Sequence, residues 1–253
     1  MRNAASTFIR KRLDPAGRYG LRTTLFAIAI ILAAIPFGFL LDQVVRRGDL
    51  ITVDTAAARN LHHLVAGREA LVVFLKVVTF LGTPPWFFLI VTVAALYLWR
   101  RDRFRLAAYL VTTSIVGGII DSVVKIVVDR PRPSLEDPIL LAHGKSFPSG
   151  HAMSSTVVYG ALLLTFMPAI PKRFRRSAIV AVSLLVLVIG FSRLALGVHY
   201  LTDVLGGYAL GAAWLAASTA TFSIWRTERG RKPVEPLEGL EPEAKRDLQV
   251  SGK

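Results

Sequence analysis

Long apolar runs alternate with short basic segments along most of this chain. Uncharged or sparsely charged runs cover residues 23–41, 85–99, 106–128, 150–167, 178–196 and 200–224. A helix needs about 20 predominantly apolar residues to cross the hydrocarbon core of a bilayer. The pattern therefore predicts an all-α, polytopic membrane protein with six transmembrane helices in a bundle. In the last run, Gly207 and Gly211 form a small-residue pattern that allows close helix packing.

The region between the first two runs has a different pattern. Residues 53–65 place apolar and polar positions at helical spacing, which predicts an interfacial helix after the first span. Its His62 and His63 have no other ligand-type neighbours and are predicted to be solvated. Residues 70–82 are apolar except for Lys76, and we interpret them as a partly embedded helix. A signal peptide is the alternative interpretation of residues 23–41, but the length of the run and the lack of a small-residue cleavage site favour an uncleaved helix.

Basic residues predict the orientation and the boundaries. The chain has 31 Lys and Arg against 17 Asp and Glu, and a formal net charge of +14. In a soluble protein this charge would suggest nucleic acid, but here it clusters between the apolar runs, as the positive-inside rule expects. We therefore expect no nucleic-acid partner and cytoplasmic termini. Residues 1–22 form a basic cytoplasmic segment, 23–225 the membrane domain, and 226–253 a tail predicted to be disordered. The absence of cysteine excludes disulfides, zinc–thiolate sites and a cysteine nucleophile.

Three polar residues stand out between the last two apolar runs: Arg193, His199 and Asp203. His199 and Asp203 are four residues apart, so they share one face at a helix start. A carboxylate there can accept the proton of one imidazole nitrogen and leave the other free to attack. The alternative is structural: a snorkelling arginine and a histidine that caps a helix.

Two further stretches of the sequence favour a catalytic role for these residues over a structural one. Residues 125–133 read K-I-V-V-D-R-P-R-P and residues 147–151 read F-P-S-G-H. With S-R-x5-H-x3-D over residues 192–203, the three form the ordered set K-x6-R-P, P-S-G-H and S-R-x5-H-x3-D. This set resembles the type 2 phosphatidic acid phosphatase superfamily, the lipid phosphate phosphatases and their relatives. The resemblance covers residues 52–225, and each signature emerges beside a predicted span on the outer face.

The resemblance implies roles for the two histidines and the carboxylate. His199 would be the nucleophile and form a phosphohistidine, while Asp203 would hold its tautomer and stabilise the imidazolium. His151 would protonate the leaving oxygen and then activate water. No metal or other cofactor is expected, because the cations are supplied by the chain.

Phosphate binding is assigned to cations and to a helix start. Lys125, Arg132 and Arg193 suit a phosphate, and Ser149 and Gly150 begin a helix whose free N–H groups favour an anion. Two supporting residues are expected: Pro148 fixes the turn, and Asp121 lies four residues before Lys125. Asp121 either aims the ammonium at the phosphate or forms a simple intramembrane ion pair. Asp129 and Arg130 flank the site as structural residues.

These features predict a metal-independent phosphatase in a bacterial-type plasma membrane, with its active site on the extracytoplasmic face. Its substrate is expected to be a membrane lipid phosphate, either an isoprenyl diphosphate such as undecaprenyl diphosphate or a phospholipid phosphate. The alternative is a broad phosphatidate or phosphatidylglycerophosphate phosphatase. The superfamily also contains vanadium haloperoxidases, which are soluble. A non-catalytic lipid-phosphate binder would be expected to lose His199 or His151, and both are present.

Overall fold

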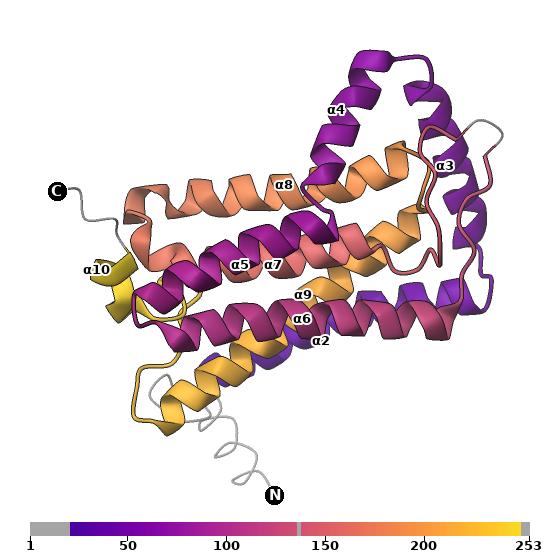
Figure 1. Ribbon diagram of the computed structural model, residues 1–253. Helices are drawn as coiled ribbons and strands as arrows, with labels where there is room; N and C mark the ends of the chain where they lie inside the picture. Colours follow the sequence, from indigo (N-terminus) through magenta and orange to yellow (C-terminus); the bar gives the residue numbers. More distant parts are fainter. Residues whose placement is uncertain (1–20, 136–137, 249–253) are drawn as a thin grey trace, which may run out of the picture.

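Long helices that lie side by side form the body of the molecule (Figure 1). The computed structural model describes residues 21–135 and 138–248, so the predicted N-terminal segment lies mostly outside the described residues. Within these ranges no strand forms, and one isolated bridge joins Glu235 to Gly239. The bundle helices are α2 (Leu21–Val45), α5 (Pro84–Arg100), α6 (Phe104–Val128), α7 (Gly150–Phe166), α8 (Arg175–Ala195) and α9 (Leu201–Glu228).

Four of the described helices are long and apolar enough to cross a membrane: Thr23–Val45, Phe104–Val128, Gly150–Ala169 and Lys172–Ala195. The helix α4 (Glu69–Phe80) and α5 meet at a bend of 45° and together form a fifth candidate. The predicted sixth span, α9, has 28 residues but does not join this group. It packs along α2 and α7, and such an inner helix uses small residues in place of large apolar ones. The structure thus supports a polytopic membrane protein with four or five candidate spans, and the count of six is not confirmed.

The small residues of α9 bring its backbone against α7. A Cβ on Gly207 would lie 2.6 Å from the carbonyl oxygen of Ser149, and one on Gly211 would lie 2.9 Å from that of Met153. Only glycine allows this approach, so the predicted small-residue contact is present. This close packing also links the starts of α7 and α9, because the N–H of Ser149 donates to the carbonyl of Asp203 at 2.9 Å.

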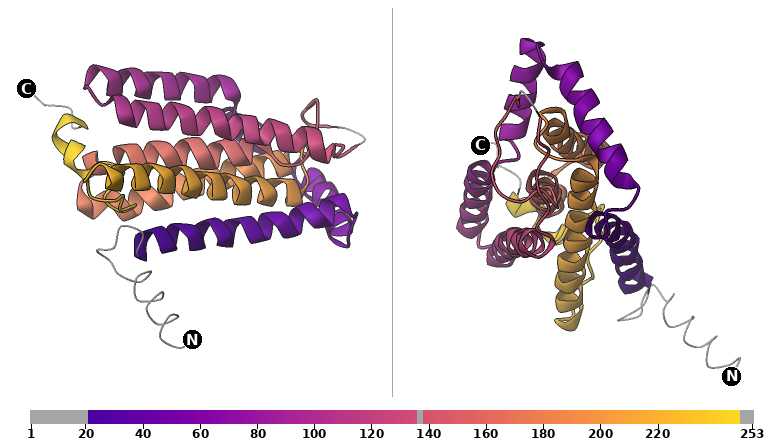
Figure 2. Two further views of the ribbon diagram at one scale, coloured as in Figure 1. Left: turned by 90° about the horizontal axis from the view of Figure 1, so that it is seen from below. Right: turned by 90° about the vertical axis from the view of Figure 1, so that its right-hand side faces the viewer.

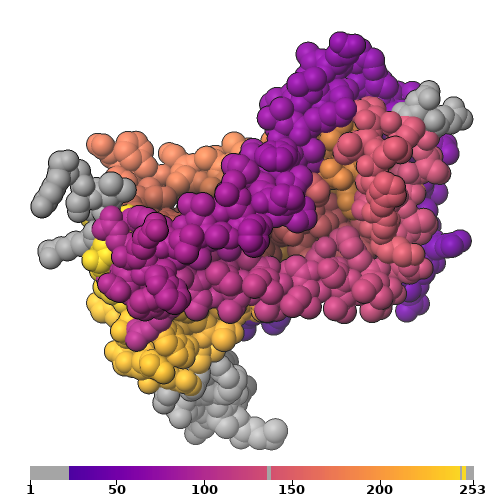
Figure 3. Space-filling model, viewed as in Figure 1, coloured from indigo at the N-terminus to yellow at the C-terminus, as the bar shows by residue number. Residues whose placement is uncertain are grey.

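Two shorter helices, α3 (Leu50–Val65) and α4, stand across one end of the bundle (Figures 1 and 2). The space-filling view shows α4 projecting from a corner of the bundle (Figure 3). The helix predicted over 53–65 is therefore present, while its position at a membrane surface stays a prediction. The expectation for His62 is wrong: its side chain is buried, on the face of α3 that also buries Asp54, Ala58 and Val65.

The chain after α9 differs from the disorder that its composition predicts. Two short helical turns, η3 (Pro242–Ala244) and α10 (Lys245–Leu248), fold back onto the bundle, and η1 (Met167–Ala169) and η2 (Lys172–Phe174) join α7 to α8. Val234 and Leu240 are buried in one cluster with Leu98, Leu106 and Leu110. A few apolar side chains, spaced between charges that pair with one another, are enough to order this segment.

Candidate active site

The predicted site residues come from four segments that meet at one end of the bundle: the end of α6, the loop that follows it, the start of α7, and the connection from α8 to α9. Lys125 joins two of the signatures. Its Nζ donates to both carboxylate oxygens of Asp121, at 2.6 and 2.7 Å, and to the carbonyl of Pro148 at 2.7 Å. The ion pair of Asp121 therefore also directs the ammonium toward the start of α7.

Gly150 has a steric reason to be glycine. A Cβ at this position would lie 3.0 Å from Oδ2 of Asp121 and 3.3 Å from Nζ of Lys125. The missing side chain lets the first turn of α7 approach the ammonium closely. The resulting concentration of positive charge and backbone N–H groups at a helix start favours an anion.

His199 lies between a carboxylate and a guanidinium. Its Nδ1 is 3.3 Å from Oδ2 of Asp203, and its Nε2 is 3.1 Å from Nη1 of Arg132. An arginine can only donate and an ionised carboxylate can only accept, so both contacts are satisfied by the neutral ring with its proton on Nδ1. The Nε2 lone pair then faces the cationic side of the site.

The charge state of His199 agrees with this tautomer. Burial of the ring lowers the pKa of His199 to about 4, against the hydrogen bond and the charge of Asp203, which raise it. Arg132 and Arg193 lower it further. The imidazole is therefore neutral at pH 7, which is the form that can attack.

Asp203 is fully occupied by hydrogen-bond donors. Its Oδ2 accepts from the N–H of Tyr200 at 2.8 Å, from the hydroxyl of Ser146, and from His199. Its Oδ1 accepts from Nη1 of Arg130 at 2.6 Å. The first of these contacts caps α9, because Asp203 lies in the first turn of that helix. The carboxylate thus serves both the helix start and the orientation of the histidine.

Three polar atoms of the site are buried without a hydrogen-bond partner in the described part of the chain: Oγ of Ser149, Nε2 of His151 and Nε of Arg193. Arg193 is held by one hydrogen bond from its Nη1 to Oγ1 of Thr79, at 3.0 Å. His151 lies within electrostatic reach of Lys125, Arg132, Arg193 and His199. A buried polar group without a partner costs roughly 1–3 kcal/mol, so three of them together favour the binding of a polar ligand at this site.

Comparison with known proteins assigns the region that holds these signatures. Residues 104–226 match the model of the PAP2 superfamily. This part of the chain belongs to that superfamily. The PAP2 region contains all the residues predicted for catalysis and phosphate binding.

Several characterised proteins are similar to the chain over part of their length. Phosphatidylglycerophosphatase B of Bacillus subtilis is 40% identical over 96 residues, which cover 37% of this chain and 46% of the relative. Lipid A 1-phosphatase of Rhizobium etli is 31% identical over 124 residues, 46% of this chain and 49% of the relative. Mouse sphingosine-1-phosphate phosphatase 2 is 30% identical over 145 residues, which cover 55% of this chain and 40% of the relative. The chain thus spans about half the length of the curated relatives that it matches, or less.

One solved structure has the same fold beyond the PAP2 region. It is the crystal structure of a transmembrane PAP2-type phosphatidylglycerolphosphate phosphatase from Bacillus subtilis. The TM-score is 0.70 at 20% identity, and the match covers 82% of this chain and 99% of that chain. At this identity the likeness shows the helical membrane fold and nothing about the substrate.

The sequence patterns missed the residues that hold Asp203 in place. Arg130 was expected only to flank the site, yet its guanidinium joins Asp203 to Asp54 of α3, at 2.7 Å from Oδ2 of Asp54. Asp54 lies outside the PAP2 match and also accepts the N–H of Thr202 at 2.9 Å. One signal was available: Asp54 and Ala58 share the buried face of α3 with Val65, so a carboxylate continues an apolar stripe. Asp129, in contrast, is exposed and pairs with Lys145.

Proposed function

We propose that the protein is an integral-membrane phosphatase that removes the terminal phosphate of an isoprenyl diphosphate through a phosphohistidine on His199. The observation that carries this proposal is the position of the His199 ring. Asp203 and Arg132 on its two sides fit only the neutral Nδ1–H tautomer, which directs the electron pair of Nε2 toward the cations, where it accepts from Arg132.

The first chemical step forms a bond from Nε2 of His199 to phosphorus and breaks the bond to the leaving oxygen. Protonated His151 gives its proton to that oxygen, and Asp203 stabilises the imidazolium that forms. Lys125, Arg132 and Arg193 stabilise the charge on the non-bridging oxygens. In the second step His151 takes a proton from water, the hydroxide attacks phosphorus, and the phosphorus–nitrogen bond breaks to restore His199.

Arg130 and Asp54 act as positioning residues in this scheme. Arg130 binds the oxygen of Asp203 that does not contact His199, and Asp54 balances the charge of that guanidinium. Asp203 therefore stays ionised and oriented although it is buried. Neither residue is assigned a contact with substrate.

An apolar groove along α5, α6 and α7 favours a substrate with a long lipid tail. It has a volume of about 730 Å³ and extends from Asp121, beside the phosphate site, to Trp99 and Phe104 at the far end. The distance from Phe104 to Asp121 along α6 is about 26 Å, which approaches the hydrocarbon thickness of a bilayer, about 30 Å. An acyl chain fills one leaflet, so a groove of this length favours a polyprenyl chain.

The alternative is a phosphatase for phosphatidate or phosphatidylglycerophosphate. The names of the relatives favour a phosphorylated lipid of some kind, since they name phosphatases of phosphatidylglycerophosphate, lipid A and sphingosine 1-phosphate. A substitution in the groove separates the candidates. Ala95→Trp fills the far end of the groove and should slow turnover of undecaprenyl diphosphate at least tenfold, while farnesyl diphosphate and phosphatidate keep their rates. Equal effects on all three substrates would remove the argument from tail length.

The activity itself is tested with purified full-length protein. Phosphate release is measured from a panel of lipid phosphates and diphosphates, with excess chelator and with vanadate as a five-coordinate phosphorus analogue. Because the chain supplies the cations, activity should survive the chelator, and vanadate should inhibit. A requirement for added magnesium would contradict this mechanism, and no release from any lipid would favour a non-catalytic binder.

The proposed arrangement in the membrane has six spans, with α5 and α9 included, both termini in the cytoplasm and the site on the outer face. The clustering of basic residues at the end of the bundle away from the site supports it. Since the chain has no cysteine, single cysteines report position without background. One placed at Ala142 should react with an impermeant thiol reagent in intact cells, and one at Ser177 should not. The reverse result would place the site in the cytoplasm.

A further inference from the structure

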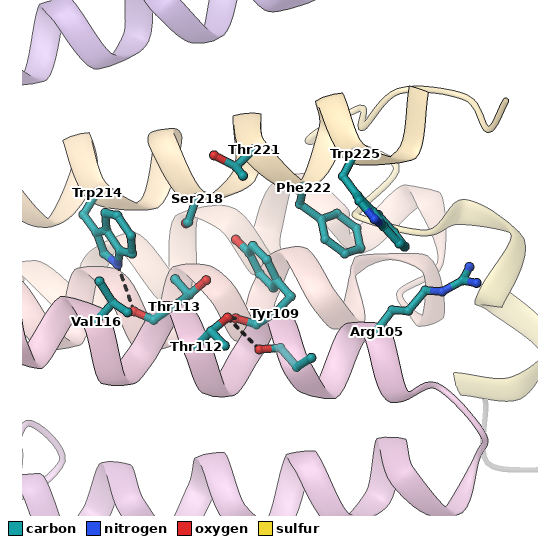
Figure 4. Close-up of a pocket in the computed structure, with 11 residues that line it drawn as sticks. Arg105, Tyr109, Thr112, Thr113, Val116, Trp214, Ser218, Thr221, Phe222 and Trp225 are labelled. Atoms are coloured by element: carbon teal, nitrogen blue, oxygen red, sulfur yellow. Dashed lines mark hydrogen bonds between the residues drawn. The ribbon is translucent and has the colours of Figure 1, made fainter. Parts of the chain in front are cut away.

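A second groove lies between α6 and α9, near the end of the bundle away from the proposed active site (Figure 4). Its volume is about 420 Å³. Arg105 lies at one end of this groove, and Lys125 of the active site lies 20 residues later on the same helix, about 30 Å away. This groove therefore belongs to the opposite side of the membrane and is separate from the phosphate site.

The walls of the groove suit one hydrocarbon chain. Trp214 lies at one end and Trp225 at the other, with Tyr109 between them (Figure 4). The polar atoms of two of these rings are already bonded: Nε1 of Trp214 donates to the carbonyl of Thr113 at 2.8 Å, and the hydroxyl of Tyr109 is 2.9 Å from Oγ1 of Thr219. The two tryptophans are 11 residues apart on α9, about 16 Å, which is half of the hydrocarbon core of about 30 Å. The groove thus matches an acyl chain of a single leaflet.

Among the described residues, no carboxylate pairs with the two arginines at the mouth of the groove, Arg105, which lines it, and Arg229, which lies over the ring of Trp225. The guanidinium carbons of Arg105 and Arg229 lie 5.1 and 5.0 Å from the ring centre of Trp225. Neither arginine has a carboxylate within ion-pair distance among residues 21–135 and 138–248. Two like charges beside one ring repel each other, and an anion at the mouth would relieve that repulsion.

We propose that this groove is a binding site for an anionic phospholipid of the leaflet opposite the active site. One acyl chain lies between α6 and α9, and Arg105 and Arg229 bind the phosphate of the headgroup. An acyl chain alone would occupy any apolar groove without preference for its headgroup, so the two arginines are what make the site selective. The proposal uses none of the residues assigned to catalysis and holds whether or not the phosphatase proposal does.

Native mass spectrometry of the full-length protein tests the site. The protein is mixed with phosphatidylglycerol or phosphatidylcholine of equal chain length, and retained lipid is counted. Two basic residues at a membrane surface favour an anionic lipid roughly thirtyfold, so phosphatidylglycerol should be retained with about that preference. The double variant Arg105→Gln/Arg229→Gln should lose it. Equal retention of both lipids by the unaltered protein would overturn the proposal.

A matched control separates this site from general surface charge. Arg173→Gln/Arg176→Gln removes the same charge from α8 and its approach, and it also removes an arginine stacked on a ring, 4.6 Å from the centre of Phe174. This control should keep the preference for phosphatidylglycerol. An equal loss in both double variants would mean that surface charge alone attracts the lipid.

The acyl chain is tested by filling the groove and leaving the arginines. Ser218→Trp places a large ring in the middle of the groove and should reduce retention of phosphatidylglycerol at least tenfold. Glycerol phosphate at millimolar concentration should not displace the lipid, because it lacks the chain. Unchanged retention in Ser218→Trp, or displacement by glycerol phosphate, would reduce the site to an anion site. Hydrolysis of a short-chain substrate, measured beside these variants, should not change.

Discussion

Two buried arginines at opposite ends of the bundle have similar surroundings and different consequences. Arg130 and Arg226 are exposed by only 7% and 1%, and each binds two carboxylates. Arg130 binds Asp54 and Asp203, while Arg226 binds Glu243 at 2.9 Å and Glu241 at 3.5 Å. Burial of a charged pair therefore does not by itself identify an active site.

The difference is in what the carboxylates contact next. Asp203 orients His199, whose second nitrogen lies 3.1 Å from Nη1 of Arg132, and the ring is within electrostatic reach of Arg193 and His151. Glu241 contacts two more arginines, Arg103 at 3.6 Å and Arg231 at 3.7 Å, and among the described residues its ion pairs join only arginines and carboxylates. Unpaired polar atoms do not separate the two networks, because Nη1 of Arg226 and Oε1 of Glu241 are also buried without a hydrogen-bond partner in the described part of the chain. A network that ends at a histidine beside further cations indicates catalysis, and one made of arginines and carboxylates alone holds the fold together.

The largest expected effect is loss of the nucleophile. His199→Ala should lower turnover by at least about 10⁴-fold on every substrate, because the proposed mechanism forms the phosphoenzyme on this residue alone. The melting temperature should change little compared with Arg226→Ala, which removes a buried arginine and its contacts with Glu241 and Glu243 and should lower the melting temperature clearly. Turnover and thermal melting are measured on both variants, and turnover near the original rate in His199→Ala would refute its role.

The second effect tests the unpaired nitrogen of His151. General acid catalysis is worth about 10²–10⁴-fold, and a monoester needs most of it because its leaving group is an alkoxide. A diphosphate expels a weakly basic phosphate and needs less. His151→Ala should therefore slow phosphoenzyme formation more for phosphatidate than for an isoprenyl diphosphate. Rapid mixing measures this first step on both substrates, and equal losses would leave His151 only the activation of water.

The third effect compares the two arginines directly. Arg130→Lys keeps the charge but cannot bridge Asp54 and Asp203, so kcat should fall about 10–100-fold with KM nearly unchanged, as is typical of groups that orient a catalytic residue. The matched change Arg226→Lys should lower the melting temperature and leave kcat as it was. Asp54→Asn should resemble Arg130→Lys. A fall of kcat in Arg226→Lys of the same size would mean that both pairs act only through stability.

The smallest effect concerns pH. Because burial lowers the pKa of His199 to about 4, its ring should stay neutral through mildly acidic pH and gain a proton only as pH falls through that value. Nitrogen NMR of labelled histidine, assigned by the loss of one signal in His199→Ala, should show one proton on Nδ1 at pH 6. Titration near pH 6.5 would show a hydrated ring and contradict the buried tautomer.

The sequence predicted the structure best where a local pattern has one physical explanation. Apolar length predicted the helices, and the signature spacing brought Lys125, His151 and His199 to one end of the bundle. The count of spans was less secure, because α9 packs inside the bundle and is not selected for contact with lipid. Likewise, His62 and Asp54 are polar residues on a helix whose spacing looked amphipathic. Only the packing of α3 against α8 and α9 decides which of its faces is buried.

Long-range pairing explains the rest of what was missed. Asp54 and Arg130 are 76 residues apart, and no local pattern links them. The charged composition of the tail is typical of disorder. The tail pairs with Arg103 and Arg226 and buries its few apolar residues only once the bundle has formed. Such contacts depend on tertiary structure and cannot be found in a window of sequence.

The packed tail also has a consequence for biosynthesis. Val234, Leu240 and Ala244 complete a cluster with residues of α5, α6 and α7, yet they are synthesised after all of these helices. Helices enter the membrane during translation, so this end of the bundle must remain unfinished until residues 234–244 have been synthesised. Quality control during that interval would meet an exposed apolar surface at the tail end. Truncation after α9 would make that interval permanent.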